Sequence, residues 1–156
     1  MTVMIVVAPL EPEDRPAWEE LARDYKAFYR TPTSDEEYDT TWRQLHDEGS
    51  GFYGLGAYLD SALDGTSARA LVGITHYLLH PLFWYGDACY LQDLFVAETA
   101  RGQGAARALI ERVAEQARIR GATRLYWMTQ DDNARARLLY DKVASFSGFI
   151  RYDYPL

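Results

Sequence analysis

The stretch from Val96 to Ile110 constrains this chain more than any other, and it reads V-A-E-T-A-R-G-Q-G-A-A-R-A-L-I. An apolar, strand-like run ends there in a short loop with two glycines, and the loop leads directly into an amphipathic helix predicted for residues 104–120. A strand, a glycine-containing turn and a helix present free backbone N–H groups and the positive end of a helix dipole to an anion. The pattern indicates a phosphate or pyrophosphate site, and the alternative is a tight turn whose glycines serve geometry alone.

The loop does not match two common nucleotide-binding motifs. A P-loop requires Gly-Lys followed by Ser or Thr, and the chain contains no such triplet. The dinucleotide-binding fingerprint requires a third glycine, where Arg107 stands, and an acidic residue about twenty residues later, where the chain reads R-L-Y-W-M-T. The sequence therefore predicts neither a P-loop nor a dinucleotide-binding site.

Length and charge narrow the class of protein. With 156 residues, 48% of them hydrophobic, we expect one globular domain over residues 1–156. The formal net charge of -7 argues against a nucleic-acid partner, and it suits a cationic substrate or simply solubility. The N-terminal apolar run indicates a strand and not a signal peptide, and no apolar run approaches the roughly 18 residues of a membrane span. We therefore expect no membrane partner.

Cys89 is the single cysteine of the chain. It permits no intrachain disulfide and indicates a reducing compartment, the cytoplasm. As an apolar side chain within a strand-like run, Cys89 is expected to lie in the core. His76 and His80 share a strand face, but two histidines without a third ligand are more typical of structural or surface residues, so no metal is expected.

Periodicity and turn residues predict the order of the elements. Strands are expected at the N-terminus and at residues 52–59, 70–79, 88–96, 124–129 and 149–154, with a hairpin loop at 60–67. Helices are expected at residues 12–29, from a capping box of Ser34 and Glu37 onward, at 104–120 and at 133–143. Hairpins followed by crossovers predict an α+β fold, with a mixed α/β sheet and helices on both faces.

The segment Arg101-Gly-Gln-Gly104-Ala-Ala106 resembles the Arg/Gln-x-x-Gly-x-Gly/Ala motif of the GNAT superfamily of acetyl-CoA-dependent N-acetyltransferases. The element order is similar along nearly the whole chain. Y-L-Q-D-L-F-V before the loop and N-A-R-A-R-L-L-Y after the fifth strand resemble the branch of Hpa-type histone and polyamine acetyltransferases and diamine acetyltransferases. Gln92 departs from the diamine acetyltransferases, which carry an acid there, and this weakens a polyamine assignment.

The resemblance implies a fold, an activity and an alternative. The fold is the GNAT acyl-CoA N-acyltransferase fold, with a central, twisted, mostly antiparallel sheet. The activity is that of an acyltransferase: acetyl transfer from the cosubstrate acetyl-CoA to a primary amine, by direct attack in a ternary complex. The alternative is a non-catalytic acyl-CoA-binding or regulatory module on the same fold. A homodimer is expected from the family and from the aromatic final strand.

The resemblance also implies the residues that bind the cofactor. The pyrophosphate would lie against the loop formed by Arg101, Gly102, Gln103, Gly104, Ala105, Ala106 and Arg107. The pantetheine arm would bond the backbone of Leu94, Phe95 and Val96, between splayed fourth and fifth strands. Asn133 and Ala136 would help to hold the arm, and Tyr140 would lie near the sulfur as general acid. From the residues alone, two alternatives stay open: Asn133 as a helix cap and Tyr140 as a packed aromatic side chain.

The acceptor amine is a small molecule or a protein lysine, and the sequence does not identify it. A primary amine must lose a proton before it attacks, and Asp93 and the acidic stretch Asp35, Glu36 and Glu37 are candidate proton acceptors. Contacts to the substrate are predicted for Gln92, Asp93, Trp84 and Tyr85. Aromatic side chains there could equally belong to the core or to a dimer surface.

Overall fold

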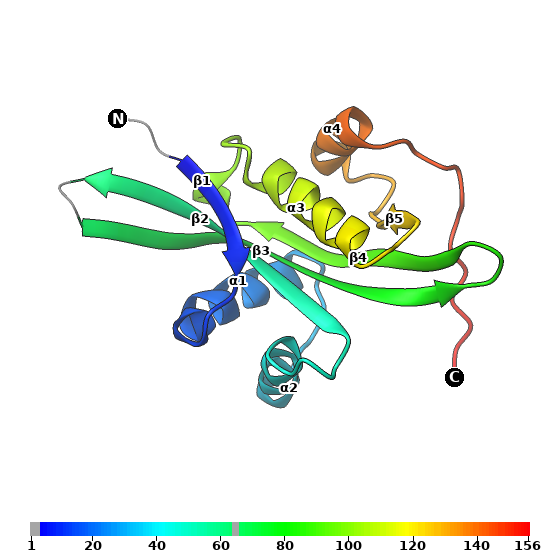
Figure 1. The fold of residues 1–156 in the computed structure, drawn as a ribbon, viewed down its shortest axis with the longest axis horizontal. Coiled ribbons are helices and arrows are strands. Elements are labelled where there is room, and N and C mark those ends of the chain that lie inside the picture. The colour runs from blue at the N-terminus through cyan, green and yellow to red at the C-terminus, as the bar shows by residue number, and fades with distance from the viewer. Residues whose placement is uncertain (1–3, 64–65) are drawn as a thin grey trace.

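The structure is a computed structural model that describes residues 4–63 and 66–156, and in these residues a twisted five-stranded sheet carries helices on both faces (Figure 1). The strands are β1 (Met4–Pro9), β2 (Phe52–Leu63), β3 (Thr66–Leu82), β4 (Gly86–Val96) and β5 (Arg124–Tyr126). The helices are α1 (Arg15–Phe28), α2 (Asp35–Leu45), α3 (Ala105–Ile119) and α4 (Ala134–Val143), with short 3-10 turns η1 (Pro12–Asp14) and η2 (Glu98–Ala100).

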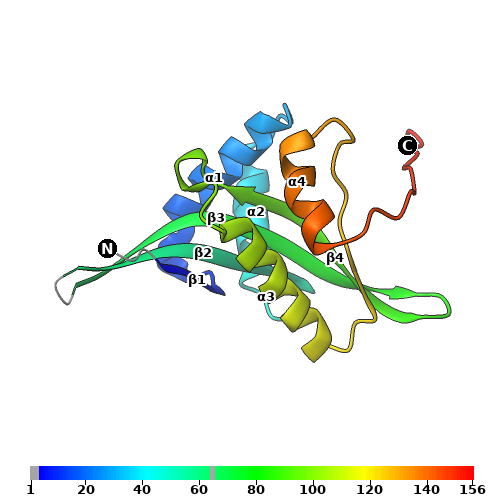
Figure 2. The same cartoon turned by 90° about the horizontal axis from the view of Figure 1, so that it is seen from above.

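The strands follow one another in the order β1-β2-β3-β4-β5, and all neighbours are antiparallel except β4 and β5. The parallel pairing is short, because β5 contacts β4 only along Ala88–Tyr90. Figure 2 shows the chain after β5 leaving β4 on its way to α4. In the part of the chain that the structure describes, residues 91–96 of β4 therefore have a strand neighbour on the β3 side only.

Two apolar clusters hold the helices to the sheet. α3 and α4 cover one face and α1 and α2 cover the other (Figure 1). The face of α3 predicted to be apolar is buried, and Leu109 and Val113 have no exposed surface. On the opposite face the fully buried side chain of Trp18 packs with Tyr38 of α2 and Ile74 of β3. The mixed sheet with helices on both faces is as predicted.

The hairpin of β2 and β3 differs from the prediction. The predicted loop at residues 60–67 is wrong for most of its length, because the two strands continue to pair through Asp60↔Arg69 and Leu63↔Thr66. Residues 64 and 65 lie outside the described residues. Backbone pairing of a projecting hairpin does not require apolar side chains, so the hydrophobic pattern stops before the strands do.

The C-terminal segment also differs from the prediction. A closing strand at residues 149–154 is wrong, since no strand follows α4. Phe149 is 88% exposed and Tyr152 is 86% exposed. Aromatic residues favour strands only where a neighbouring strand supplies hydrogen bonds and packing, and the short β5 offers little edge for that purpose.

Candidate active site

The loop between η2 and α3 takes its shape from two glycines. Gly102 has a φ of +78° and Gly104, the N-cap residue of α3, has a φ of +88°. A Cβ atom at either position would meet no heavy atom within 4 Å. The glycines are therefore required by the left-handed backbone and not by crowding, and the space beside them is open.

In the part of the chain that the structure describes, six consecutive backbone N–H groups in this loop and the first turn of α3 have no acceptor. Among residues 4–63 and 66–156 no atom accepts a hydrogen bond from the N–H of residues 102–107, and the first N–H with a partner is that of Ala108, which donates to the Gly104 carbonyl over 3.0 Å. The positive end of the α3 dipole lies at the same place. The loop that the sequence predicts to bind an anion therefore offers a set of free donors.

The two arginines beside this loop are held by protein partners. Arg101 Nε donates to the Val96 carbonyl over 3.2 Å, and its guanidinium lies over the Phe95 ring. Arg107 Nε donates to Glu111 over 2.8 Å on the exposed side of α3. Gln103 donates weakly to the Thr99 carbonyl at 3.5 Å. The two guanidinium groups therefore lie at opposite ends of the loop.

The open edge of β4 leads toward the loop. Leu94, Phe95 and Val96 pair with Thr75, Ile74 and Gly73 of β3. In an antiparallel ladder alternate residues direct their N–H and C=O groups to the other side, and on that side β5 no longer accompanies β4. Apart from the Val96 carbonyl, which accepts from Arg101, the backbone groups of this stretch that point away from β3 are therefore free to bond an extended ligand.

A bulge in β4 lies beside a cavity of the molecule. His76 lies opposite Asp93 and Tyr77 lies opposite Leu91, so Gln92 is the extra residue. A bulge bends its strand and re-aims the neighbouring side chains. Gln92 and Asp93 both line a cavity of about 470 Å³ between α1, α2 and the sheet.

Some of the residues predicted to bind the substrate or accept its proton line the cavity, and others do not. Asp93, Glu36 and Glu37 line it together. Trp84 and Tyr85 do not, because they occupy the turn between β3 and β4, where Trp84 is 93% exposed. Those two aromatic side chains belong to a different part of the surface.

Asp93 lies at the end of a buried hydrogen-bond chain. Trp18 Nε1 donates to His76 Nε2 over 2.9 Å, and His76 Nδ1 lies 2.9 Å from Asp93 Oδ2. Because an indole N–H can only donate, His76 Nε2 carries no proton, and the Nδ1–H group of a neutral ring donates to the carboxylate. Burial alone would raise the pKa of Asp93, but the hydrogen bond from His76 holds it below its usual range.

Tyr25 of α1 and Tyr29, the residue that follows the helix, link Asp93 to the region of Tyr140. Tyr25 faces the Asp93 carboxylate, and burial together with that negative charge raises the pKa of its hydroxyl. The rings of Tyr25 and Tyr29 meet edge to face at 5.0 Å, and Tyr29 is in turn an electrostatic neighbour of Tyr140. The end of α1 therefore lies near both Asp93 of β4 and Tyr140 of α4.

Tyr140 is half-buried on α4, and its ring lies edge-on to Trp127 at 5.4 Å. Burial, and to a lesser extent the neighbouring Tyr29, raises the pKa of Tyr140 to about 12. The phenol therefore remains protonated throughout the physiological range. A protonated hydroxyl can donate a hydrogen bond and cannot act as a base.

Asn133 caps α4. Its side-chain oxygen accepts from the Ala136 N–H over 3.4 Å, and its amide nitrogen donates to Thr129 over 3.1 Å. The interpretation of Asn133 as a helix cap is confirmed, and the Ala136 N–H is consumed by the cap.

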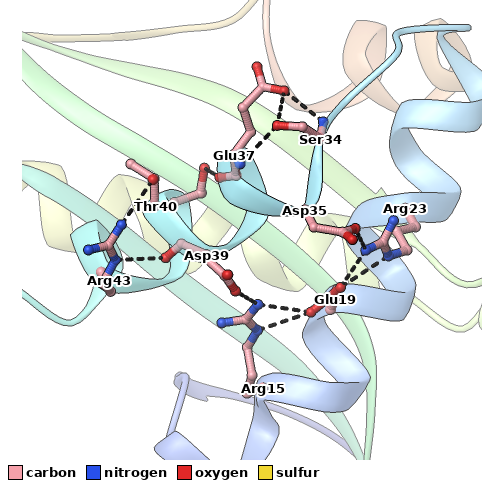
Figure 3. Close-up of polar contacts among 10 residues, drawn as sticks. Arg15, Glu19, Arg23, Ser34, Asp35, Glu37, Asp39, Thr40 and Arg43 are labelled. Carbon is pink, nitrogen blue, oxygen red and sulfur yellow. Dashed lines mark hydrogen bonds and ion pairs between the residues drawn. The ribbon is translucent and has the colours of Figure 1, made fainter.

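The outer wall of the cavity is α2, which ion pairs fasten to α1 (Figure 3). Arg15 bonds Asp39 at 2.6 Å as well as Glu19 at 2.9 Å. Arg23 bonds Asp35 at 2.6 Å and the same Glu19 at 2.7 Å. The predicted box of Ser34 and Glu37 caps α2, which explains why the helix starts beside the cavity.

The remaining candidates lie outside this site. Cys89 is fully buried in the core, as predicted, and burial raises the pKa of its thiol to about 11. His80 Nε2 bonds the Tyr126 hydroxyl at 2.7 Å. Within the described residues no three His, Cys, Asp or Glu side chains form a metal-binding group. No described helix is both long enough and apolar enough to cross a membrane.

Sequence reasoning did not foresee the parts played by Trp18 and Tyr25, which lie in the helix predicted for residues 12–29. Nor did it foresee that His76 bonds both Trp18 and Asp93. The contacts depend on the register of β3 against β4 and on the docking of α1. No spacing along the chain encodes either of them.

Comparison with known proteins agrees with this arrangement. A model of the acetyltransferase (GNAT) family matches residues 18–146. The D-amino-acid N-acetyltransferase HPA3 of Saccharomyces cerevisiae is 37% identical over 141 residues, 90% of this chain and 84% of that protein. The thialysine N-epsilon-acetyltransferase of Bos taurus is 34% identical over 89 residues, 57% of this chain and 52% of that protein. Among solved structures, aminoglycoside N-acetyltransferase AAC(6')-Iy in complex with CoA has a TM-score of 0.80, 12% identity and coverage of 99% of this chain and 97% of that one.

The chain belongs to the acetyltransferase (GNAT) family. It is an N-acetyltransferase, an enzyme that transfers an acetyl group to an amine. The family and the fold predicted from the Arg101–Ala106 segment and the element order are both confirmed. A non-catalytic module on the same fold is not favoured.

Proposed function

We propose that the protein transfers the acetyl group of acetyl-CoA to the amine of a small molecule, by direct attack while both substrates are bound. The observation that carries the proposal is the run of six free N–H groups at residues 102–107, next to the open edge of β4. Free donors at a helix N-terminus fit a pyrophosphate, and a free strand edge fits an extended amide-containing arm. When bound, acetyl-CoA supplies the acetyl thioester.

The residues present fit this ligand at both ends. The loop offers backbone donors in open space between Arg101 and Arg107, whose outer N–H groups can turn toward phosphate oxygens. The backbone of Leu94, Phe95 and Val96 would bond the arm, with one N–H of this stretch polarising the thioester carbonyl. Asn133 and Ala136, at the start of α4, would border the arm from the other side of the gap beside β5.

Tyr140 is proposed to assist departure of the sulfur. A thiol has a reference pKa near 8.5, and the pKa of Tyr140 is about 12. Full proton transfer from the phenol to a thiolate would therefore be uphill by about 5 kcal/mol. Tyr140 would donate a hydrogen bond to the sulfur as charge develops, and the proton that completes the reaction would come from the acetylated amine.

Asp93 is proposed to hold the amine in its ammonium form, and the proton would then pass to water. The pKa of Asp93 is lowered, so the carboxylate stays charged and is a weak base; it lines the cavity, and its neighbour His76 is neutral. An ammonium ion would be attracted to the carboxylate before it loses its proton. Glu36 and Glu37 line the same cavity but lie on the outer wall formed by α2.

The volume of the cavity supports a small acceptor. About 470 Å³ is within the range of small-molecule sites, and an amino acid fits easily. The relative named as a D-amino-acid N-acetyltransferase supports an amino acid as the acceptor. A protein lysine is the alternative, and it would have to enter the cavity as a single extended side chain.

Thiol release from acetyl-CoA by the purified protein tests this function. The panel comprises D- and L-amino acids, thialysine, polyamines, aminoglycosides and a basic peptide. We expect turnover with free amino acids, absent in a sample without amine. Turnover confined to the peptide would replace the small acceptor by a protein lysine, and no turnover with any amine would overturn the proposal.

We further propose that the enzyme is a homodimer that works in the cytoplasm. Phe149, Ile150, Tyr152 and Tyr154 are exposed in the C-terminal segment, and a second copy of the chain would cover such a surface. The single cysteine supports a reducing compartment. Light scattering of the full chain and of a chain that ends at Ser145 measures the number of subunits in each. The same number of subunits in both would contradict this role of the segment.

A further inference from the structure

The cavity lined by Asp93 is also lined by a positively charged side chain. Its lining includes one lysine, Lys26 of α1, and among the described residues no arginine. Lys26 is half-buried, and its Nζ atom lies 5.6 Å from the centroid of the Tyr25 ring. Its charge acts on both Asp93 and Glu37. Lys26 and Asp93 thus place a positive and a negative charge in one cavity.

Asp93 is not neutralised by its own partner. The bond from Trp18 keeps His76 in the neutral form, so the pair of His76 and Asp93 has a net charge of one negative unit. His76 therefore orients the carboxylate and leaves its charge available. Lys26 acts on this carboxylate without forming a close ion pair with it, so a cationic group of a ligand can bind there.

Lys26 is likewise not neutralised. Within residues 4–63 and 66–156, the ion pairs with N···O distances of up to 4.0 Å are formed by arginines and His76, and none involves Lys26. The nearby Glu37 is engaged at the helix cap, where its carboxylate accepts from the N–H and the hydroxyl of Ser34 at 2.7 and 2.9 Å. An anionic group of a ligand would therefore find an available ammonium ion in the cavity.

We infer that the cavity binds its acceptor as a zwitterion, with the ammonium group at Asp93 and a carboxylate at Lys26. This inference rests on the proposed function and goes beyond it by assigning a specificity-determining residue. Lys26 would favour amino acids over neutral amines that lack a carboxylate. It would also disfavour polyamines and aminoglycosides, because a second ammonium group would meet a like charge.

Three acceptors that share one side chain test the role of Lys26. D-phenylalanine carries the carboxylate, D-phenylalaninamide replaces it by a neutral amide, and 2-phenylethylamine lacks it. The variants are Lys26→Gln, Lys26→Arg and, as the matched control, Lys142→Gln, which removes the exposed lysine of α4. For each compound the KM of the variant is compared with the KM of the wild-type enzyme, so that the different basicities of the three amines cancel.

The zwitterion site predicts that Lys26→Gln raises the KM for D-phenylalanine about tenfold. The same variant should change the KM for the amide and for phenylethylamine less than about twofold, with kcat of each compound retained. Lys26→Arg should restore much of the preference, and Lys142→Gln should leave all three compounds unchanged.

Two results would contradict the account at different levels. If the wild-type enzyme acetylates these amines and Lys26→Gln changes the KM of all three equally, or of none, the assignment of Lys26 is wrong and the acetyltransferase activity stands. If neither these three compounds nor the wider amine panel gives thiol release, the proposed function fails, and the zwitterion site fails with it.

Discussion

His76 and Asp93 lie opposite each other in the ladder of β3 and β4, and Nδ1 of His76 is 2.9 Å from Oδ2 of Asp93. The bulge at Gln92 and the indole of Trp18 fix this relationship from two sides. Its consequence is a carboxylate that stays ionised although it is largely buried. Such a group suits the proposed binding of an acceptor amine in its ammonium form, which must lose a proton before it attacks.

Replacement of His76 by phenylalanine should make binding of the amine sensitive to acid. The pKa of Asp93 is lowered by His76 in spite of burial, so loss of this donor raises the pKa and the carboxylate becomes protonated at a higher pH. The KM for the amine should then rise as the pH falls toward about 5, over a range in which the wild-type KM changes less.

Steady-state profiles between pH 5 and about 8 measure this effect, and His80→Phe is the matched control. His80 lies on the same strand but bonds Tyr126 outside the cavity, so its variant should follow the wild-type profile. Superimposable profiles for His76→Phe and the wild-type enzyme would show that His76 does not set the charge of Asp93.

Replacement of Tyr140 by phenylalanine should lower kcat about 100-fold and leave the affinity for CoA nearly unchanged. The variant keeps the ring that packs on Trp127 and removes only the donor. Thiol-release kinetics with calorimetric CoA binding separate the two quantities. Tyr152→Phe, in the exposed C-terminal segment, is the control. Wild-type turnover in Tyr140→Phe would remove Tyr140 from the chemistry.

Replacement of Gly104 by alanine should weaken CoA binding about tenfold. The left-handed φ of +88° disfavours any side chain, and relief of that strain would turn the free N–H groups away from their common direction. Gly121→Ala is the matched control, because Gly121 follows the other end of α3 with a φ of +80° and equally open space. Both variants should lose about 1 kcal/mol of stability.

Calorimetric titration with CoA distinguishes the two glycine variants. We expect the loss of affinity in Gly104→Ala alone, while the thermal midpoints of the two proteins fall together. A loss of CoA affinity of the same size in Gly121→Ala would mean that general destabilisation, and not the anion site, explains the effect.

Removal of the ion pairs between α1 and α2 should loosen the wall of the acceptor cavity. In a protein with Arg15→Gln and Arg23→Gln together, the contacts of α1 to Asp39 and Asp35 are lost (Figure 3). Exposed pairs contribute little one by one, so we expect a rise of only about threefold in the KM for the amine, with CoA affinity unchanged.

Salt provides the internal test of this prediction. High ionic strength screens the same pairs, so the difference between the double variant and the wild-type enzyme should shrink in 0.5 M NaCl, a concentration at which the Debye length is about 4 Å. Arg151→Gln, which breaks an exposed pair with Asp153 in the C-terminal segment, is the control. A difference that is independent of salt would exclude the ion pairs as its cause.

The sequence predicted those features that depend on local pattern. The two glycines before an amphipathic helix indicated a loop with free backbone donors, and Ser34 with Glu37 indicated the start of α2. The hydrogen-bond chain from Trp18 through His76 to Asp93 could not be predicted, because its members are 58 and 17 residues apart and meet only through strand register and helix docking. The final strand was predicted from aromatic composition alone, which does not supply a pairing partner.

The most direct test of the account is a two-substrate kinetic analysis with acetyl-CoA and an amino acid, with the mass of the intact protein measured after incubation with acetyl-CoA alone. Direct attack predicts intersecting initial-velocity lines, one N-acetylated product per thiol released, and an unmodified protein, as the burial and raised pKa of Cys89 would favour. Parallel lines together with an acetylated protein would show transfer through a covalent enzyme intermediate and would contradict the account.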